Sequence, residues 1–370
     1  MYYTYYHSKK VTEKPNFFNL IFNTAPKTYT LRTIQLKHPK SRRFLSAKQK
    51  EQVRQAEYSL KKCYLTMGLF EKTHENDYYK FFIPKRNHKL REINAPNNEF
   101  KEALANTKDI FQNEIRCLSH PAAYAYIPNT ATLDALKLHQ DNESKWFLKI
   151  DLKDFFPSCT PELLYTKLKH LYPFYYLDKE HSELLKKILH IASLNGSLPQ
   201  GSPFSPYLSN LVMVEYDFKI QALLKTKKSK FVYTRYADDI LISSPYDFNW
   251  RTIQDEIEEL LSPAFTINTE KTRYGSQAGS NWNLGLMLNK DNNITLGHIK
   301  KRTLNAMLNN FFNAFNDNEP WSIPDTQVLQ GQLSYLAHIE PDYYRHIIQK
   351  YQKKYTLNYH EVLSSILNPN

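Results

Sequence analysis

Two adjacent carboxylates, Asp238 and Asp239, stand between two apolar runs in the stretch FVYTRYADDILISS. The runs 231–233 and 240–242 each predict a short strand, and the polar centre predicts the turn of a hairpin. Two neighbouring acids repel each other and are poorly placed in apolar surroundings unless water solvates them or a cation binds them. Because Asp-rich turns are common, the stretch alone leaves both interpretations open.

A third carboxylate, Asp151, ends another apolar run in FLKIDLKDFFPS. A solvated loop acid needs no apolar strand leading into it, whereas a metal site does, because a rigid strand fixes the ligand geometry. We therefore expect Asp151, Asp238 and Asp239 to supply carboxylates to two Mg²⁺ ions, with Mn²⁺ as a substitute. Two such ions roughly 3.5–4 Å apart activate an attacking hydroxyl and stabilise the leaving oxygen in phosphoryl transfer.

The elements ahead of Asp151 are predicted from apolar patterning and capping residues. Residues 46–70 are rich in Lys, Gln and Glu and begin at Ser46, so they predict a capped helix. Residues 79–83 and 90–93 predict the two strands of a hairpin around the turn KRNHK. The segment NNEFKEALANTKDIFQNEI then predicts another helix, and SKWFLKIDLKDFF opens with the strand that carries Asp151.

The elements after Asp151 continue the mixed pattern. Thr160 and Pro161 have the residue types that cap and open a helix. The segment SPFSPYLSNLVMVEYDFKIQALL predicts an amphipathic helix entered through prolines, and RTIQDEIEELLSPAF predicts another helix before a short strand near Thr266. From about residue 300 the chain is helical in pattern and basic, so the order predicts an α/β part followed by a helical part.

The composition favours a nucleic-acid partner. A net charge of +12 with 27 Tyr and 21 Phe fits a surface that tracks phosphates and stacks on bases, although many basic proteins are merely soluble. The chain has no Walker or dinucleotide loop. It has no apolar run long enough for a membrane span, no secretory signal at its start, and only three scattered cysteines. We therefore expect a cytoplasmic protein without a membrane partner.

Five motifs between about Phe81 and Gly275 resemble those of reverse transcriptases, in family order and at family-like spacings. YADD has DLKDFFPS upstream, and LPQGSPFSPYLSNLV lies between them. FFIPKRNHKLREINAP resembles the fingers hairpin, and NTEKTRYG resembles the lysine-bearing motif that follows the catalytic hairpin. Each motif alone is weak, but together they are specific. The resemblance implies an RNA-directed DNA polymerase that uses two-metal nucleotidyl transfer, and it favours a cation at Asp238.

The resemblance also implies an α+β right-hand fold with fingers, a palm that contains the catalytic β-hairpin, and a helical thumb. We expect residues 1–45 to form a basic, Tyr-rich extension and residues 46–145 to form the fingers with part of the palm. Residues 146–280 would form the palm and residues 281–370 the thumb. The implied partners are an RNA template, a DNA product and deoxynucleoside triphosphates, and a partner protein or homo-oligomer stays open.

The motifs carry roles onto individual residues. Asp151 and Asp238 match the metal-binding aspartates, and Asp239 matches the second acid of the hairpin, which is usually the less directly ligating one. Lys271 matches the lysine proposed as the general acid for the pyrophosphate leaving group. A surface ion pair between Lys271 and Glu270 is the ordinary alternative.

Other matched residues would contact the nucleotide. Phe156 matches the steric gate, because a ring against C2′ of the incoming sugar would clash with a 2′-OH. Gln200 matches the residue that lies against nucleotide and template. Lys85 and Arg91 match the fingers cations that grip the triphosphate. Tyr236 either packs on the primer or supports the turn.

Several of these residues have simple structural alternatives. Either Phe155 or Phe156 is expected to belong to the core while the other faces the site. Lys89 competes with Lys85 for the fingers role, and Asp154 is expected to be solvated or to cap a helix.

The basic helices after residue 300 are expected to hold the template–primer duplex by its backbone. Lys300, Lys301 and Lys353 are the candidate contacts. Ordinary solvated helix faces are the alternative.

Two segments bear on the class of reverse transcriptase. Residues 123–140 resemble the segment that retron and group II intron enzymes carry before the first catalytic strand, and residues 282–302 resemble the hairpin that opens the retron-type thumb. The Val-Thr-Gly signature of retron enzymes is absent, and LGLML stands in its place. We therefore favour a defence-associated enzyme of the "unknown group" type, used with a noncoding RNA against phage, over a retron enzyme that makes RNA-linked DNA.

Functions of other classes are weighed against this one. A catalytically inactive nucleic-acid-binding protein is disfavoured by the complete set of acids, and an RNA-synthesising palm polymerase is disfavoured by Phe156. Untemplated or homopolymer synthesis stays open, since the motifs define the chemistry and not the template. The N-terminal tyrosines either prime DNA synthesis or belong to an arm that stacks on RNA or packs on the fingers. They are Tyr2, Tyr3, Tyr5 and Tyr6.

Overall fold

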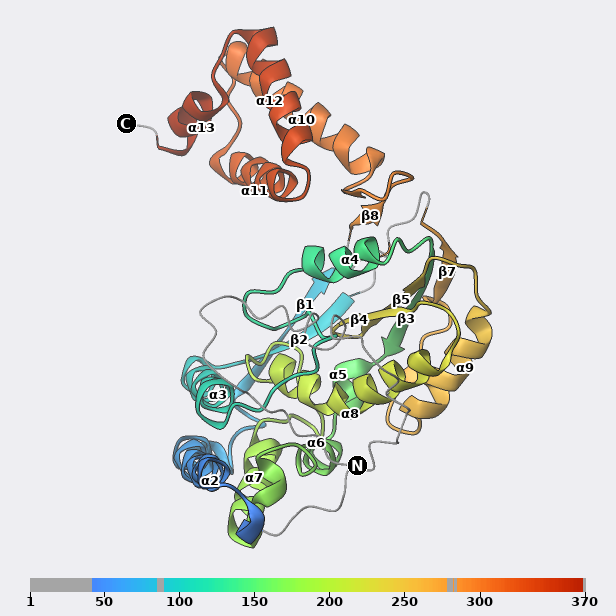
Figure 1. Ribbon diagram of the computed structural model, residues 1–370. Helices are drawn as coiled ribbons and strands as arrows, with labels where there is room; N and C mark the ends of the chain where they lie inside the picture. Colours follow the sequence, from blue (N-terminus) through green and yellow to red (C-terminus); the bar gives the residue numbers. More distant parts are fainter. Residues whose placement is uncertain (1–41, 85–89, 278–281, 283–284, 369–370) are drawn as a thin grey trace.

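The computed structural model describes residues 42–84, 90–277, 282 and 285–368. The described residues form a helical part, a central sheet and a second helical part beyond it (Figure 1). Nearly all of the expected N-terminal extension lies outside the described residues, and so do Lys85 and Lys89.

Helices α2 (Ala47–Met67), α3 (Asn98–Ile110) and α7 (Lys179–Ile191) pack together at one end of the molecule (Figure 1). Ser46 caps α2 as predicted, because its Oγ accepts from Gln49 N at 3.2 Å while Gln49 Oε1 accepts from Ser46 N at 3.0 Å. Short turns of other helix types flank these elements. They are η1 (Arg42–Phe44), η2 (Gly68–Phe70), η3 (Phe111–Ile115) and η4 (Phe174–Tyr176).

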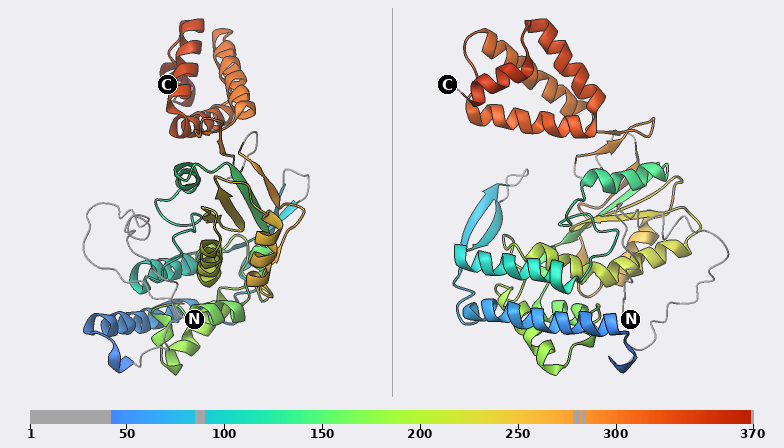
Figure 2. Two further views of the ribbon diagram at one scale, coloured as in Figure 1. Left: turned by 45° about the vertical axis from the view of Figure 1, so that its right-hand side comes forward. Right: turned by 60° about the vertical axis from the view of Figure 1, so that its left-hand side comes forward.

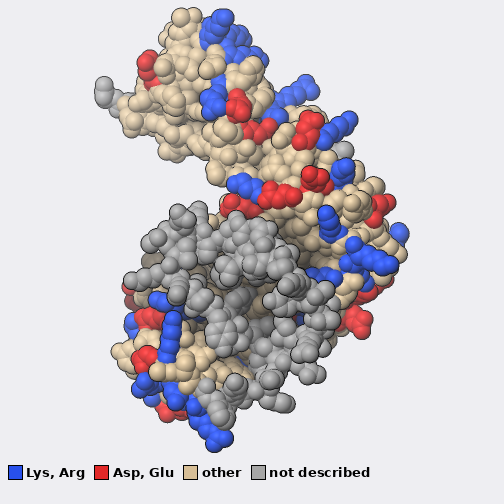
Figure 3. Space-filling view, viewed as in Figure 1, with Lys and Arg blue, Asp and Glu red and all other residues tan. Residues whose placement is uncertain are grey.

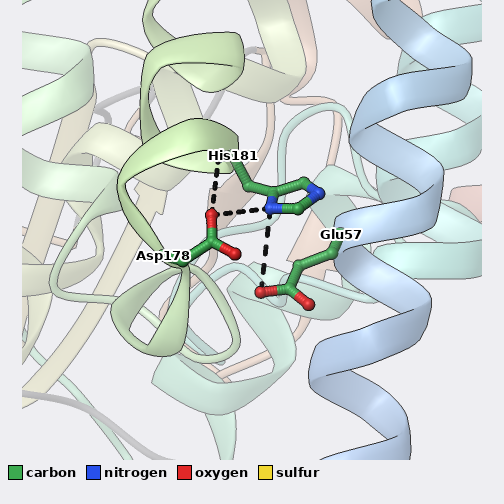
Figure 4. A group of neighbouring side chains, drawn as sticks. All are labelled: Glu57, Asp178 and His181. Atoms are coloured by element: carbon green, nitrogen blue, oxygen red, sulfur yellow. Dashed lines mark hydrogen bonds and ion pairs between the residues drawn. The ribbon is translucent and has the colours of Figure 1, made fainter.

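A polar cluster fastens α7 to α2 (Figure 4). His181 Nδ1 lies 2.7 Å from Asp178 Oδ1 and 3.9 Å from Glu57 Oε1, and Arg42 pairs with the same Glu57 oxygen. Asp178 also caps α7, and the hydrogen bond from His181 N lowers the pKa of its carboxyl group. Because each acid already has a partner from the chain, we interpret this cluster as a link between two helices.

Strands β1 (Tyr78–Pro84) and β2 (Leu90–Pro96) form the predicted antiparallel hairpin, in which Phe81 faces Ile93 and Ile83 faces Arg91. The hairpin stands away from α2 and α3 (Figure 2). Most of its side chains are exposed, including three aromatic ones of β1. They are Tyr79, Phe81 and Phe82.

The central sheet has the strand order β4–β5–β3–β6, with β7 also paired to β3. Its strands are β3 (Trp146–Lys153), β4 (Val232–Tyr236), β5 (Asp239–Ser244), β6 (Thr266–Ile267) and β7 (Arg273–Ser276). Every pairing in it is antiparallel. The predicted hairpin around the adjacent acids is therefore confirmed as β4–β5, and β3 lies directly beside it.

Side chains alternate between the two faces of this sheet. One face is apolar and packs into the main core, together with α8 (Ser205–Thr226) and α9 (Trp250–Leu261). The residues that this face contributes are Leu148, Ile150, Leu152, Tyr233, Ile240 and Ile242.

The other face is covered along only part of its length. Phe147 and Leu241 pack there with Trp282 and with Leu136 of α4 (Thr132–Asp141), and the Phe147 and Trp282 rings stack at 5.3 Å. On the same face the strands end in charged residues, which form the candidate site described below.

Helix α8 corrects one expectation, since it is not amphipathic. Eight consecutive residues, 207–214, are buried, so every side of the helix meets protein there. It packs against α9 and against α6 (Pro161–Leu168), whose N-cap Thr160 accepts from Leu163 N at 3.2 Å as predicted. A helix buried all round can hold polar side chains in the interior when they find partners.

The C-terminal part is helical, as predicted. It begins with the small hairpin of β8 (Met287–Leu288) and β9 (Ile294–Thr295) and continues into four helices (Figures 1 and 2). These helices are α10 (His298–Asn316), α11 (Ile323–Ile339), α12 (Pro341–Tyr355) and α13 (Tyr359–Leu367). Their apolar sides form a core that continues through the β8–β9 hairpin and Trp282 to Phe147 and Leu241, while the helices themselves stand beyond α4, away from the sheet (Figures 1 and 2).

Glu340 ties the hairpin to the helices at the α11–α12 junction. Its Oε1 accepts from Thr295 Oγ1 at 2.8 Å and from Leu296 N at 2.9 Å, and its Oε2 pairs with Lys301 at 2.9 Å. Within the described ranges, no helix is both long and apolar enough to cross a membrane.

Candidate active site

The three acids predicted from the sequence meet at one corner of the sheet. Asp151 on β3 is the direct partner of Asp239 on β5, and Leu152 N donates to the Asp238 carbonyl at 3.1 Å. Since Asp151 and Asp239 are directly opposite in antiparallel strands, their side chains leave the sheet on the same face. The structure therefore brings all three residues together from segments that are far apart in the sequence.

The turn that carries Asp238 has an unusual backbone. Ala237 is buried and has φ of 57°, a left-handed conformation that is uncommon for a residue with a Cβ. Arg235 Nη1 donates to the Ala237 carbonyl at 2.9 Å, which holds the turn from inside. Such a conformation persists only where the surrounding structure determines it.

Arg235 is itself held by a buried polar network. Its Nε and Nη2 donate to the two Asp217 oxygens at 2.8 Å each, and its Nη1 also donates to Asn210 Oδ1 at 3.1 Å. Tyr233 donates its hydroxyl to Asp217, and Asn210 Nδ2 donates to the Ala125 carbonyl at 2.7 Å. The network joins α8, β4 and the loop before α4, and it lies directly beneath the acid-bearing turn.

Lys271 forms an ion pair with Asp151. Its Nζ lies 3.1 and 3.0 Å from the two oxygens of the carboxylate, and Asn268 Nδ2 donates to one of them at 3.2 Å. The alternative of a surface pair with Glu270 is therefore not what the structure shows. The Lys271 side chain is 64% exposed, so its ammonium group contacts Asp151 while it remains accessible to water.

Lys149 forms a second ion pair, with Asp239. Its Nζ lies 2.7 Å from Asp239 Oδ2, and the two side chains are only 16% and 19% exposed. Sequence reasoning did not identify this lysine. The sequence did contain an indication of it: Lys149 lies two residues before Asp151, so both side chains are on the same face of the strand.

Asp238 differs from the other two acids. Burial, and then the negative charges of Asp239 and Asp151, raise the pKa of its carboxyl group above the usual range. Within the described residues no lysine or arginine forms an ion pair with it. The cluster thus holds more carboxylate than ammonium charge, and hard oxygen ligands of this kind fit a divalent cation.

Phe155 is the core member of the Phe155–Phe156 pair, and the expectation that Phe156 faces the site stays a prediction. Phe155 is buried in the main core, whereas Phe156 is half-buried and packs edge-on against it at 5.7 Å. Both belong to α5 (Phe155–Ser158), which follows β3 directly. Asp154 is exposed and makes no capping hydrogen bond, so of the two expected roles it has the solvated one.

The turn that contains Gln200 touches the base of the β1–β2 hairpin. The Gln200 carbonyl accepts from Asn94 N at 2.7 Å. Gly201 has φ of 126°, and a Cβ there would lie 2.6 Å from the Asn94 oxygen and 2.9 Å from a methyl group of Ile93. Only glycine fits this contact, which places the hairpin relative to the sheet.

The remaining predicted residues lie around the acids. Arg91 is exposed on β2, and Tyr236 is half-buried and faces Asp239 across the β4–β5 pair. Tyr126, which sequence reasoning missed, lies close enough for Asp238 to act on it: burial and that charge raise the pKa of its phenol, while Arg91 opposes the shift. Tyr126 belongs to the segment 123–140, whose resemblance was the only sequence signal for it.

Comparisons with known proteins agree with this geometry. Residues 83–298 match the family described as "Reverse transcriptase (RNA-dependent DNA polymerase)". The "Retron Ec83 reverse transcriptase" of Escherichia coli is 29% identical over 309 residues, which cover 81% of this chain and 94% of the relative. The "Retron Ec73 reverse transcriptase" of the same organism is 33% identical over 241 residues, covering 63% and 74%.

Solved telomerase structures are also similar. That of apo telomerase from Candida tropicalis aligns with a TM-score of 0.47 at 12% identity and covers 80% of this chain and 62% of the telomerase chain. The complex of Candida albicans telomerase with a fragment of telomeric RNA aligns with a TM-score of 0.43 at 14% identity and covers 78% and 63%.

The family match confirms the expected fold class and the reverse transcriptase resemblance. Both curated relatives are retron enzymes, so the lineage is retron-like, and the preference for the "unknown group" class stays a prediction. The chain belongs to the reverse transcriptase family and is an RNA-directed DNA polymerase.

Proposed function

We propose that Asp151 and Asp238 bind two Mg²⁺ ions and that deoxynucleotides are added at this corner of the sheet. The observation that carries the proposal is the position of Lys271, whose ammonium group contacts both oxygens of Asp151 beside the raised-pKa carboxyl of Asp238. The site therefore attracts a cation in the place where the family chemistry requires one. When bound, the ions would activate the primer hydroxyl and stabilise the leaving oxygen.

Two further residues have proposed roles in nucleotide addition. Lys271 is exposed, so it can leave Asp151 and donate a proton to the departing pyrophosphate. Arg91 lies on the β1–β2 hairpin, which the Gln200 turn contacts at its base. The charges of Arg91 and Asp238 both act on the phenol of Tyr126, so the two residues lie near the same side chain. We assign Arg91 to the triphosphate, together with Lys85.

Two aromatic residues are proposed to select and position the substrate. Phe156 is half-buried at the start of α5, close in sequence to Asp151, and is assigned to exclude the 2′-OH of ribonucleotides. Tyr236 faces Asp239 and is assigned to support the turn on the primer side.

The helical C-terminal part is proposed to act as the thumb, within the bounds 281–370. Lysine and arginine side chains gather over its upper part (Figure 3). Lys300 and Arg302, near the start of α10, and Lys353, near the end of α12, are exposed. Lys301 instead pairs with Glu340 and lies over the Tyr343 ring at 4.6 Å, so we replace it with Arg302 as a candidate phosphate contact.

The biological role is proposed from the relatives. The two relatives are retron reverse transcriptases, and the sequence prediction favours a defence enzyme that copies a noncoding RNA. Sequencing the RNA and DNA that co-purify with the protein would test this. One recurrent RNA with matching cDNA supports the proposal, whereas cDNA of random cellular RNAs contradicts it. DNA that shifts in size after ribonuclease treatment would identify an RNA-linked product.

The polymerase assignment has a direct biochemical test. Purified protein should extend a DNA primer on an RNA template with deoxynucleotides and Mg²⁺, and chelation of the metal should stop extension. Extension without any template would instead favour the homopolymer alternative.

A further inference from the structure

We propose that Lys149 is a resident counter-ion that keeps Asp239 out of the metal-binding set, so that Asp151 and Asp238 are the carboxylates that hold the ions. Lys149 would thus be a positioning residue that acts through Asp239. This inference rests on the proposed metal site, and its new element is Lys149: the resemblance already implies that Asp239 ligates less directly, and Lys149 supplies a physical reason for it in this chain.

The register of the sheet places Lys149 where it can do this. It lies two residues before Asp151 on β3 and faces Leu241 on β5, while Asp239 faces Asp151. Lys149 therefore reaches Asp239 diagonally across the strand pair, on the same face of the sheet. The resulting contact of 2.7 Å between Nζ and Oδ2 is a short charge-assisted hydrogen bond.

The residues around Lys149 and Asp239 oppose the separation of this ion pair. Leu241, which faces Lys149, is buried in the second core with Phe147 and Trp282, so apolar side chains border the pair on one side. On the other side Lys149 faces Arg273 of β7. A second cation on that side disfavours any rotation of Lys149 away from Asp239.

The two lysines of the site differ in how easily they can leave. Lys271 is 64% exposed, so water can replace its contact with Asp151 at little cost. Lys149 is 16% exposed, and its departure would leave two poorly solvated charges without partners. An incoming cation would therefore displace Lys271 and leave Lys149 in place.

The ligand atoms of the three acids are not gathered around one point. Within the part of the chain that the structure describes, one group of three metal-ligating side chains has its ligand atoms within 4.8 Å of one another, and it is the cluster of Glu57, Asp178 and His181. Asp151, Asp238 and Asp239 form no such group. Each of two carboxylates instead points to a lysine, Asp239 to Lys149 and Asp151 to Lys271.

Direct measurement of Mn²⁺ binding, followed by electron paramagnetic resonance without nucleotide, tests the proposal independently of activity. The variant Lys149→Gln should bind Mn²⁺ at least about fivefold more tightly, because Asp239 is released toward the ions. Lys149→Arg keeps the charge and should bind as the wild type does. Asp239→Asn leaves the Lys149 ammonium group without its partner, so it should weaken Mn²⁺ binding, but clearly less than Asp238→Asn does.

The double variant K149Q/D239N separates the proposal from a general loosening of the site. It should return Mn²⁺ affinity to the wild-type value, because the released carboxylate is gone. Thermal unfolding of every variant shows whether the protein is folded when the ion is added.

Three outcomes would decide against parts of the account. If D239N weakens Mn²⁺ binding as much as D238N does, Asp239 is a ligand and the role of Lys149 is wrong. If folded K149Q binds Mn²⁺ as the wild type does, Lys149 is only structural. If D151N and D238N leave Mn²⁺ binding unchanged, the proposed metal site itself fails, whatever Lys149 does.

Discussion

Arg235 donates from Nε and Nη2 to the two oxygens of Asp217, at 2.8 Å each, and both side chains are fully buried. The same guanidinium group holds the carbonyl of Ala237, one residue before Asp238. A bidentate pair of this kind adds direction as well as energy. The turn that carries Asp238 is therefore anchored from the interior of the protein, through a residue of α8.

Replacing Asp217 with Asn should destabilise the protein by about 3–5 kcal/mol, because Arg235 would remain buried without its counter-charge. Urea unfolding measures this loss. The matched control is Asp342→Asn, which breaks an exposed pair with Arg345 and should cost less than about 1 kcal/mol. Equal effects of the two substitutions would show that the buried network contributes little to the fold.

His139 should make stability depend on pH. It is buried between Ser243 and Thr234, with Nε2 2.8 Å from Thr234 Oγ1, and burial lowers its pKa to about 3. The unfolded chain binds this proton near pH 6.5, so stability falls as the pH drops from about 6.5 toward 3. Between pH 6.5 and pH 5 the loss from this residue alone is about 2 kcal/mol.

The variant His139→Gln isolates this effect, since it removes the titrating group and keeps a polar side chain. Unfolding free energies at pH 7 and pH 5 should differ by about 2 kcal/mol less in the variant than in the wild type. His120, whose pKa burial lowers to about 4, stays in both proteins and cancels from the comparison. Identical pH dependence in the two proteins would mean that folding leaves the pKa of His139 unchanged, which would contradict its burial-lowered pKa.

The sequence predicted the elements that apolar patterns specify. The runs before and after the adjacent acids become β4 and β5, and the run before Asp151 becomes β3, because alternation and turn residues are local signals. The N-cap roles of Ser46 and Thr160 were also predictable, because a cap is set within three residues.

The polar contacts inside the fold were not predictable in this way. Asp217 and Asn210 of α8 lie 18 and 25 residues before Arg235, and nothing in the sequence indicates that both meet this arginine of β4. The pairing of Lys149 with Asp239 depends on the register of β3 against β5, which periodicity does not specify. Lys271 was predicted as an acid catalyst, but its contact with Asp151 was not.

Phe156→Ala should raise ribonucleotide incorporation more than it lowers deoxynucleotide incorporation, because the half-buried ring no longer obstructs the 2′-OH. Single-nucleotide addition with each substrate gives the ratio of the two kcat/KM values. Phe155→Ala is the matched control: that ring is buried in the core, so its loss should cost about 3–5 kcal/mol of stability and leave sugar selectivity unchanged. If Phe156→Ala keeps wild-type selectivity, the gate lies elsewhere.

Exposed thumb cations should set the salt dependence of duplex binding. Replacing Lys300, Arg302 and Lys353 with Gln should flatten the plot of log binding constant against log salt, by about 0.9 for each duplex phosphate that the variant no longer neutralises. The control is Lys186→Gln on α7, an exposed lysine at the other end of the molecule. An unchanged slope in the triple variant would assign phosphate binding to other parts of the chain.

The central claim, that the acids at the sheet corner perform nucleotide transfer, is tested most directly by Asp238→Asn in primer extension on an RNA template. The account predicts that extension falls by more than about a hundredfold, while thermal stability and RNA binding stay near wild type, because the change removes a metal ligand from a turn. Asp154→Asn, which alters an exposed acid three residues after Asp151, should extend normally. Wild-type extension by folded Asp238→Asn would contradict the account.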